Sequence, residues 1–431
     1  MDYLELLILV LSFVTLLAMG VPVAWSIGIS TCLTILVSIP FLPATTTVAQ
    51  RMATGLDSFS LLAIPFFILA GQLMNRGGIA RRLIDFAKTL VGSLPGGLAH
   101  VNVIAAMLFG AISGSAVAAA SAIGTIMNPE MERAGYSREF GASVNITAST
   151  TGLVIPPSNI LIVYSLASGG VSIAALFLAG YLPGIITGLF LMIVTSAWAT
   201  YKKFPVGKRS TLRQVAKTFI KALPSLLLLI IVIGGIVAGV FTATEASAIA
   251  VLYCLVLGFI YKEIDWKQLP DILRNSVETT SIVALLIGTS IAMSWVMSYE
   301  NIPQNFTEAL LSISDNKYVL LFLINMILLF VGIFMDMTPA VLIFTPILLP
   351  VVTQLGMDPT HFGIVMVLNL CIGLCTPPVG SVLFVGVGVA KTSIQKVLRP
   401  LLPLFLAMLV ALILVTYIPA LSLWLPRVFG Y

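Results

Sequence analysis

The sequence predicts an all-α integral membrane protein made of two inverted-topology repeats with re-entrant helical hairpins and broken transmembrane helices. Hydrophobic residues make up 59% of the 431 residues and charged residues 9%, and the mean hydropathy is +1.10. Apolar runs recur along the chain without strand-like alternation, which indicates helices, because a helix satisfies its own backbone hydrogen bonds in lipid. Two runs carry the same glycine and proline interruption, which predicts a duplicated plan.

The net charge of +5 comes largely from four short basic segments, at 76–88, 202–221, 262–274 and 391–399. The positive-inside rule places all four in the cytoplasm, which puts both chain termini on the outer side. None of the segments forms a tract that could follow a nucleic acid, so membrane lipid is an expected partner and nucleic acid is not.

The first repeat is predicted over 1–221, and its first part, 1–92, holds scaffold spans and an arm. Its segments are, in order, spans at 3–20 and 22–42, an arm at 44–57, a span at 60–75, an amphipathic stretch at 78–92, a hairpin and broken helix over 97–168, and a span at 172–202. The two halves of the hairpin have about 15 residues each, which is short for a span. Because basic residues flank both halves, we expect a re-entrant hairpin that opens to the cytoplasm, with its tip at 113–115.

The second repeat is predicted over 222–431, and its scaffold spans and arm occupy 222–299. Its segments are spans at 222–241 and 243–262, an amphipathic stretch at 264–277, a span at 279–299, a hairpin and broken helix over 317–391, and a last span at 398–424. The polar run "YENIPQNFTEALLSISDNK" before the hairpin is expected to be an outer loop. The second hairpin has its tip at 336–339 and opens outward.

A shift of 221 positions aligns the two halves at residue level. Over residues 108–157, twelve positions are identical after this shift, including Pro156 with Pro377 and Pro157 with Pro378. Composition alone would give about three to five matches in such an apolar window. The copies start on opposite sides of the membrane, and inverted repeats with paired interrupted helices are typical of secondary transporters.

The matching interruptions are "GLVIPP" and "GLCTPP". Two prolines beside a glycine unwind a helix, so carbonyl groups from Gly152 to Ile155 and from Gly373 to Thr376 should lose their helical partners. Such groups can hold a cation, and the helix ends that follow, from Pro157 and Pro378, favour anionic groups. The alternative is a pair of ordinary proline kinks.

The hairpin tips supply further oxygen atoms. Ser113 and Ser115 lie at one tip, and Asp336 and Thr338 lie at the other. Carboxylates inside membranes are rare and usually functional, although Asp336 could instead cap a helix at a solvated tip. The sequence has no metal-binding His/Glu cluster and no nucleophile with a plausible base, so an enzyme is not expected.

At these residues the sequence resembles the large membrane (M) subunit of tripartite ATP-independent periplasmic (TRAP) transporters. The resemblance covers essentially the whole chain and includes "GLDSFSLLAIPFFILAGQLMN", "GAISGSAVAAASAIG", "GLVIPPSNILIVY" and "GLCTPPVGSVLFV". It implies an elevator-type, Na⁺-coupled importer of the ion transporter superfamily in the bacterial inner membrane. It also implies two partners, a small four-helix membrane subunit and a periplasmic substrate-binding protein that delivers an organic acid.

The resemblance also implies residue roles. Two or more Na⁺ ions are expected as coupling ions. One sodium site should involve Ser113 with Gly152, Ile155 and Pro157, and the other should involve Gly332 and Asp336 with Gly373 and Thr376. The candidates for contact with the substrate are Ser115, Ser158, Thr338 and Thr376.

The implied substrate is an organic acid, and a sugar acid such as sialic acid is favoured over a C4-dicarboxylate. A stand-alone Na⁺/dicarboxylate symporter of the same fold is the alternative. The chain starts with the first span of the repeat, so the small subunit is expected to be a separate polypeptide.

Overall fold

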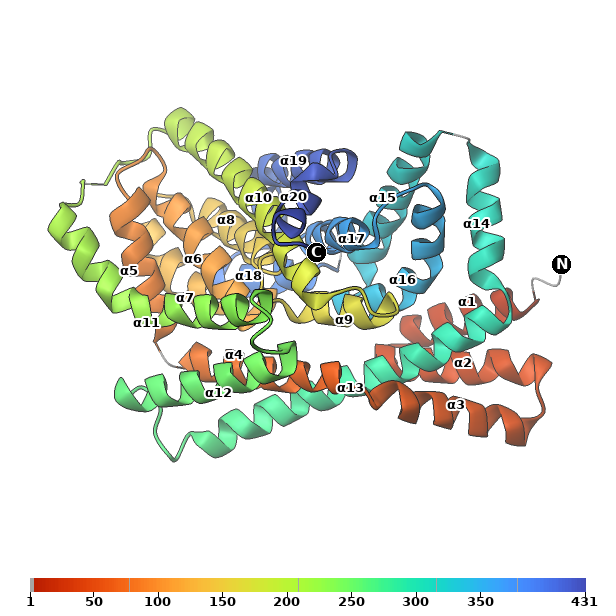
Figure 1. Ribbon diagram of the computed structural model, residues 1–431. Helices are drawn as coiled ribbons and strands as arrows, with labels where there is room; N and C mark the ends of the chain where they lie inside the picture. Colours follow the sequence, from red (N-terminus) through yellow and green to blue (C-terminus); the bar gives the residue numbers. More distant parts are fainter. Residues whose placement is uncertain (1–3, 77, 208, 315, 378) are drawn as a thin grey trace.

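The computed structural model describes residues 4–76, 78–207, 209–314, 316–377 and 379–431, and no strand occurs among them. Helices account for nearly all the regular structure (Figure 1). Eight of the described helices are long and apolar enough to cross a membrane, and several more are apolar but shorter. The predicted all-α membrane class is confirmed.

The first half of the chain contains ten α-helices and one short 3-10 helix within the described residues. They are α1 (Leu4–Ala18), α2 (Val23–Ser38), α3 (Phe41–Leu56), η1 (Phe59–Leu62), α4 (Ala63–Arg76), α5 (Ile79–Val91), α6 (Gly97–Ser113), α7 (Ala116–Arg133), α8 (Arg138–Thr151), α9 (Asn159–Ala167) and α10 (Ile173–Lys202).

The second half contains ten further helices within the described residues. They are α11 (Leu212–Val237), α12 (Ala243–Ile260), α13 (Leu269–Tyr299), α14 (Ile302–Ile313), α15 (Lys317–Phe334), α16 (Met337–Gln354), α17 (Pro359–Gly373), α18 (Ser381–Ala390), α19 (Ile394–Tyr417) and α20 (Ala420–Val428).

Helix boundaries repeat along the chain. The bounds of α7, shifted by 221 positions, coincide with those of α16, and those of α8 match α17 to within one residue. Thr150 and Cys371 are also 221 positions apart, and the Cys371 thiol donates to the Thr150 carbonyl oxygen at 3.2 Å. Equivalent positions of the two halves therefore touch where α8 and α17 meet, as expected close to a pseudo-twofold axis.

Five predicted segments differ from the structure. Most of the amphipathic stretch at 264–277 and the whole span at 279–299 belong to one continuous helix, α13, and α11 begins at Leu212 rather than near 222. The polar run predicted as an outer loop contains α14, because Pro303 occupies the first turn, where proline is tolerated, and the residues after it are amphipathic. The last span ends at Tyr417 and is followed by a separate short helix, α20.

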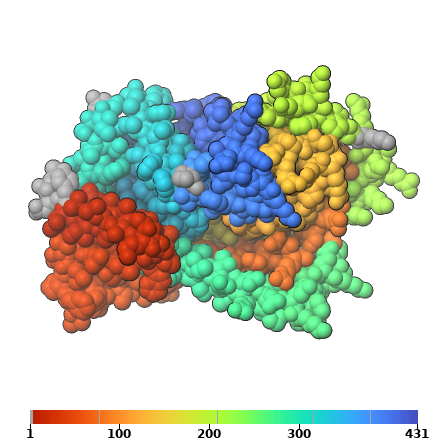
Figure 2. Space-filling model, turned by 180° about the vertical axis from the view of Figure 1, so that it is seen from behind, coloured from red at the N-terminus to blue at the C-terminus, as the bar shows by residue number. Residues whose placement is uncertain are grey.

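The helices form two bodies. The first four helices pack with α12 and α13 into a layer along the lower side in Figure 1, and this layer is called the scaffold below. The hairpins α6–α7 and α15–α16 and the broken helices α8–α9 and α17–α18 lie above it with α10 and α19. Seen from behind, α1 to α3 form a lobe at one lower corner (Figure 2).

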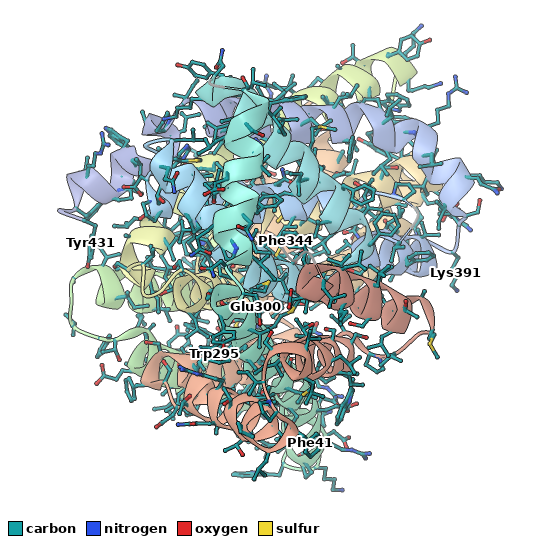
Figure 3. All side chains as sticks on the ribbon, turned by 90° about the vertical axis from the view of Figure 1, so that its right-hand side faces the viewer. Phe41, Trp295, Glu300, Phe344, Lys391 and Tyr431 are labelled. Atoms are coloured by element: carbon teal, nitrogen blue, oxygen red, sulfur yellow. The ribbon has the colours of Figure 1, made fainter. Side chains whose placement is uncertain are left out.

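Polar contacts join the scaffold to the neighbouring segments. Arg82 on α5 forms an ion pair with Glu263 at 2.6 Å, and its guanidinium group lies 3.7 Å from the centre of the Tyr261 ring. At the other end of the scaffold, Ser38 donates a hydrogen bond to the Glu300 carboxylate at 2.8 Å. Figure 3 shows Glu300 and Trp295 beside the N-terminal helices. The first contact fixes α5 to the segment between α12 and α13, and the second joins the ends of α2 and α13.

Candidate functional site

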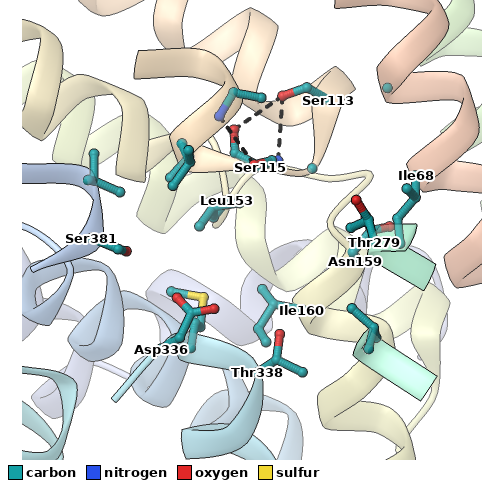
Figure 4. A pocket seen from close by; sticks show the side chains of 18 of the residues that line it. Ile68, Ser113, Ser115, Leu153, Asn159, Ile160, Thr279, Asp336, Thr338 and Ser381 are labelled. Carbon is teal, nitrogen blue, oxygen red and sulfur yellow. Dashed lines mark hydrogen bonds between the residues drawn. The ribbon is translucent and has the colours of Figure 1, made fainter. Parts of the chain in front are cut away.

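A cavity of about 490 Å³ lies where the two hairpin tips face the scaffold helices α4 and α13. Figure 4 shows Ser113 and Ser115 at one side of this cavity and Asp336 and Thr338 at the other. Residues of both broken helices complete the lining. The polar lining residues are Gln72, Asn75, Ser113, Ser115, Ser121, Asn159, Thr279, Asp336, Thr338 and Ser381.

The first tip is a tight turn between α6 and α7. Gly114 has φ +62°, a left-handed conformation that glycine adopts without strain. Ser115 then caps α7, because its hydroxyl accepts a hydrogen bond from the Ala118 amide at 3.2 Å. A side chain at Gly114 would meet the Asn159 amide nitrogen at 2.8 Å, so the start of α9 lies directly against the tip.

The second tip joins α15 to α16 and presents a carboxylate to the cavity. Asp336 precedes α16 but forms no side-chain capping hydrogen bond, and its side chain is exposed. It also forms no ion pair with any described residue. Asp336 is the one charged residue among the described residues that line the cavity.

The first broken helix has a free backbone segment between α8 and α9. The carbonyl groups from Gly152 to Pro157 accept no hydrogen bond from any described residue. Gly152 packs directly on α6, since a methyl group on it would lie 2.6 Å from the Gly110 Cα atom. The Ser158 hydroxyl is buried and has no hydrogen-bond partner in the described structure.

The second broken helix, between α17 and α18, repeats the close packing but not the free carbonyl groups. The Gly373 and Thr376 carbonyl oxygens accept hydrogen bonds from the amides of Thr376, at 2.9 Å, and Gly380, at 3.1 Å, so the prediction of free carbonyl groups is wrong for these residues. A methyl group on Gly373 would lie 2.6 Å from the Gly332 Cα atom, so hairpin and broken helix again meet backbone to backbone. The Thr376 hydroxyl donates to the Ile372 carbonyl oxygen at 2.8 Å, which leaves its lone pairs available. Pro378, predicted to start the following helix, lies outside the described residues.

The cavity brings together Ser113, Ser115, Asp336 and Thr338. The other candidates lie outside its lining and belong to the breaks or to the hairpin arm behind them: Gly152, Ile155, Pro157, Ser158, Gly332, Gly373 and Thr376. Each break still reaches the cavity through a neighbouring residue, Leu153 or Leu374.

The sequence analysis missed several polar residues of the cavity. Gln72 and Asn75 lie in the otherwise largely apolar α4, Thr279 lies in a short polar run of α13, and the Ser381 hydroxyl is buried without a partner in the described structure. Asn159 lies two residues after the first break, and its position at the start of a helix was the one available signal.

The cavity suits hydrogen bonding better than metal catalysis. Within the described residues, no group of three or more His, Cys, Asp or Glu side chains could hold a metal ion. The lining instead offers neutral amide and hydroxyl groups, together with one carboxylate and nearby free carbonyl groups. Hard cations and hydroxylated ligands bind in oxygen-rich surroundings of this kind.

Paired hairpins and paired broken helices around one polar cavity define a membrane transporter fold. The solved structure of the Alcanivorax borkumensis YdaH transporter has this fold, with a TM-score of 0.66 over 89% of this chain and 88% of that one. The sequence identity is 13%, so the similarity concerns the fold alone.

Residues 10–421 match the family model described as "Tripartite ATP-independent periplasmic transporter, DctM component". The chain belongs to this family, as the resemblance predicted. It is therefore one component of a tripartite transport system, a multi-pass membrane permease and not an enzyme.

Three relatives illustrate the family. The chain is 58% identical to the uncharacterized protein YgiK of Salmonella typhimurium, over 97% of this chain and 96% of the relative. It is 39% identical to the C4-dicarboxylate TRAP transporter large permease protein DctM of Rhodobacter capsulatus, over 97% and 98%. It is also 39% identical to the sialic acid TRAP transporter large permease protein SiaM of Vibrio cholerae, over 96% and 97%.

Proposed function

We propose that this chain imports an organic acid across the bacterial inner membrane, coupled to Na⁺ and by an elevator mechanism. A small membrane subunit enlarges the scaffold, and a periplasmic binding protein delivers the substrate. The observation that carries the proposal is the cavity into which both hairpin tips project, with an unwound helix beside each tip.

The two breaks have the donor set that Na⁺ requires. Sodium is a hard cation that takes oxygen ligands, and interrupted transporter helices supply them as free carbonyl groups. At the first break, free carbonyl groups from Gly152 to Pro157 lie close to the α6 end that carries Ser113. At the second break the carbonyl groups of Gly373 and Thr376 already accept backbone hydrogen bonds, so the ion would rely more on the Thr376 hydroxyl, the backbone at Gly332 and Asp336 at the adjacent tip. Both sets would hold the ion without a soft ligand.

The cavity lining supports a hydroxyl-rich acid. No described lining residue is basic, so two carboxylate groups would find no direct cationic partner there. Amide and hydroxyl side chains both donate and accept, which suits a substrate with several hydroxyl groups. We therefore favour a sugar acid such as sialic acid over a C4-dicarboxylate, with Ser115 and Thr338 as direct contacts. Ser158 and Thr376 would reach the substrate from the breaks.

The proposed orientation follows from charge. The basic segments at the ends of α4, α10, α12 and α18 lie in the cytoplasm, and both termini are periplasmic. Hairpin α6–α7 then opens to the cytoplasm and α15–α16 opens to the periplasm. In this frame α5 and α14, which occupy equivalent places in the two halves, link the scaffold to the hairpins from opposite sides.

Reconstitution tests the proposal. The chain and its small subunit are placed in liposomes, the binding protein is added outside, and uptake of labelled acids is followed. An inward Na⁺ gradient should drive uptake, a K⁺ gradient should not, and omission of either partner should abolish it. Sialic acid should compete better than succinate. Na⁺-driven uptake by this chain alone would instead identify a stand-alone symporter.

A further inference from the structure

The scaffold forms one wall of the cavity. This wall comes from α4, through Ile64, Ile68, Gln72 and Asn75, and from α13, through Thr279. It directly touches the opposite wall, because a methyl group on Gly71 would lie 2.8 Å from the Ser113 carbonyl oxygen. In Figure 4, Ile68 and Thr279 lie across the cavity from Asp336 and Ser381.

The polar side chains of this wall have hydrogen-bonding groups that the described part of the protein does not use. The amide groups of Gln72 and Asn75 form no hydrogen bond with any part of the chain that the structure describes. The two residues are three positions apart on α4 and so lie on one face of that helix. Thr279 is exposed, and its hydroxyl donates to the Asn275 carbonyl oxygen at 2.9 Å, which leaves its lone pairs free.

The wall changes character along α4. Its first part offers the apolar side chains of Ile64 and Ile68, and its last part offers Gln72 and Asn75, next to Arg76. Thr279 lies in the first half of α13, shortly after Arg274, where a basic segment ends. The polar part of the wall is thus the part nearest the basic segments, which the proposed orientation places in the cytoplasm.

We propose that Gln72, Asn75 and Thr279 line the path by which the substrate leaves the cavity for the cytoplasm. Their free amide and hydroxyl groups replace the hydrogen bonds that the substrate gives up at the hairpin tips. Ile64 and Ile68 close the other end of the wall, because apolar side chains offer water and solutes no hydrogen bonds. This inference rests on the proposed function and names scaffold residues that act in release.

Labelling from one side tests the path directly. Asn75→Cys and Thr279→Cys are made in a chain whose four cysteines are replaced, assembled with its partners in oriented vesicles, and treated with a membrane-impermeant thiol reagent. Both should react from the cytoplasmic side only, and substrate with Na⁺ should slow the reaction. Ile282→Cys is the matched control, one turn further along α13 and exposed outside the cavity lining, and should stay unreactive in lipid.

Transport kinetics provide a second test of the release path. Gln72→Leu keeps the side-chain size and removes its ability to form hydrogen bonds. Net uptake at saturating substrate should therefore fall by about fivefold, the factor that corresponds to the free energy of one hydrogen bond. The Na⁺ concentration for half-maximal uptake should not change, because Gln72 belongs to neither proposed sodium site. Gln72→Asn should restore part of the rate.

The outcomes separate the two proposals. If the wild-type complex shows no Na⁺-driven uptake, the proposed function fails whatever the labelling shows. If uptake is Na⁺-driven but Asn75→Cys and Thr279→Cys react from the periplasmic side, or from neither side, the release path is wrong. A Gln72→Leu complex with wild-type uptake overturns the role of Gln72 in the same way.

Discussion

Gly152 allows a direct test of the proposed first sodium site. The glycine ends α8 and lies against α6, with no side chain between the two backbones. A methyl group on Gly152 would lie 2.6 Å from the Gly110 Cα atom, 3.0 Å from its carbonyl carbon and 3.1 Å from the Ala106 carbonyl oxygen. All three neighbours are backbone atoms, so no rotamer change can relieve the contact.

The structure sets the magnitude for Gly152→Ala. Carbon atoms in contact prefer about 3.5–4.0 Å, so α6 and the break must separate by about 1 Å. Overpacking of this kind costs about 1–3 kcal/mol. Metal ligands are held to within about 0.2 Å, so a shift of this size should displace the carbonyl groups that hold the ion. We expect the Na⁺ concentration for half-maximal uptake to rise at least about tenfold, which corresponds to 1.4 kcal/mol.

Two assays measure this effect. Na⁺-dependent uptake gives the half-saturating concentration, and the Na⁺-induced rise in melting temperature of the purified chain reports binding without transport. Gly388→Ala is the matched control, because Gly388 lies within α18, beyond the second break, and nothing lies within 4 Å of an added methyl group. If Gly152→Ala keeps wild-type Na⁺ activation while the protein remains folded, the placement of an ion beside Gly152 is refuted.

Three further predictions concern the tips, the breaks and the scaffold. Asp336→Asn should insert normally but lower Na⁺ affinity about tenfold, since it removes the cavity's charge; unchanged uptake kinetics would show that this carboxylate takes no part in ion binding. Pro156→Ala with Pro157→Ala should restore helix across the free carbonyl groups and weaken Na⁺ activation of uptake, and an unaltered activation curve would contradict this. Arg82→Gln should destabilise the detergent-purified protein by about 1 kcal/mol in thermal unfolding, with the difference from wild type shrinking at high salt; a difference independent of salt would show that packing and not charge is lost.

The sequence predicted the hairpins and broken helices best. The repeat at 221 positions located hairpins and breaks closely, because glycine, proline and small polar residues there interrupt otherwise apolar helices. The scaffold of the second half was predicted less well. α3 ends at Leu56, before the run Asp57-Ser58, whereas the equivalent stretch of α13 has no such break and continues as one helix. The residues of α14 were predicted to be a loop because they are polar. The equivalent helix of the first half, α5, was recognised by its amphipathic pattern.

The sequence allowed only some of the residues that line the cavity to be predicted. Tip residues such as Ser113 and Asp336 stood out because polar groups are rare in apolar runs. Gln72 and Thr279 did not, since the side of a helix that faces a cavity depends on which helices pack around it. The contact between Gly110 and Gly152 is likewise a property of the assembled fold, and Gly110 carried no signal of its own.

The coupling of acid to sodium is the central claim. In liposomes that contain the chain, its small subunit and the binding protein, uptake of radioactive sodium is measured with and without the organic acid. The account predicts that the acid accelerates sodium uptake in the wild-type complex, and that Asp336→Asn weakens this acceleration. Uptake of the acid without any accompanying movement of sodium would contradict it.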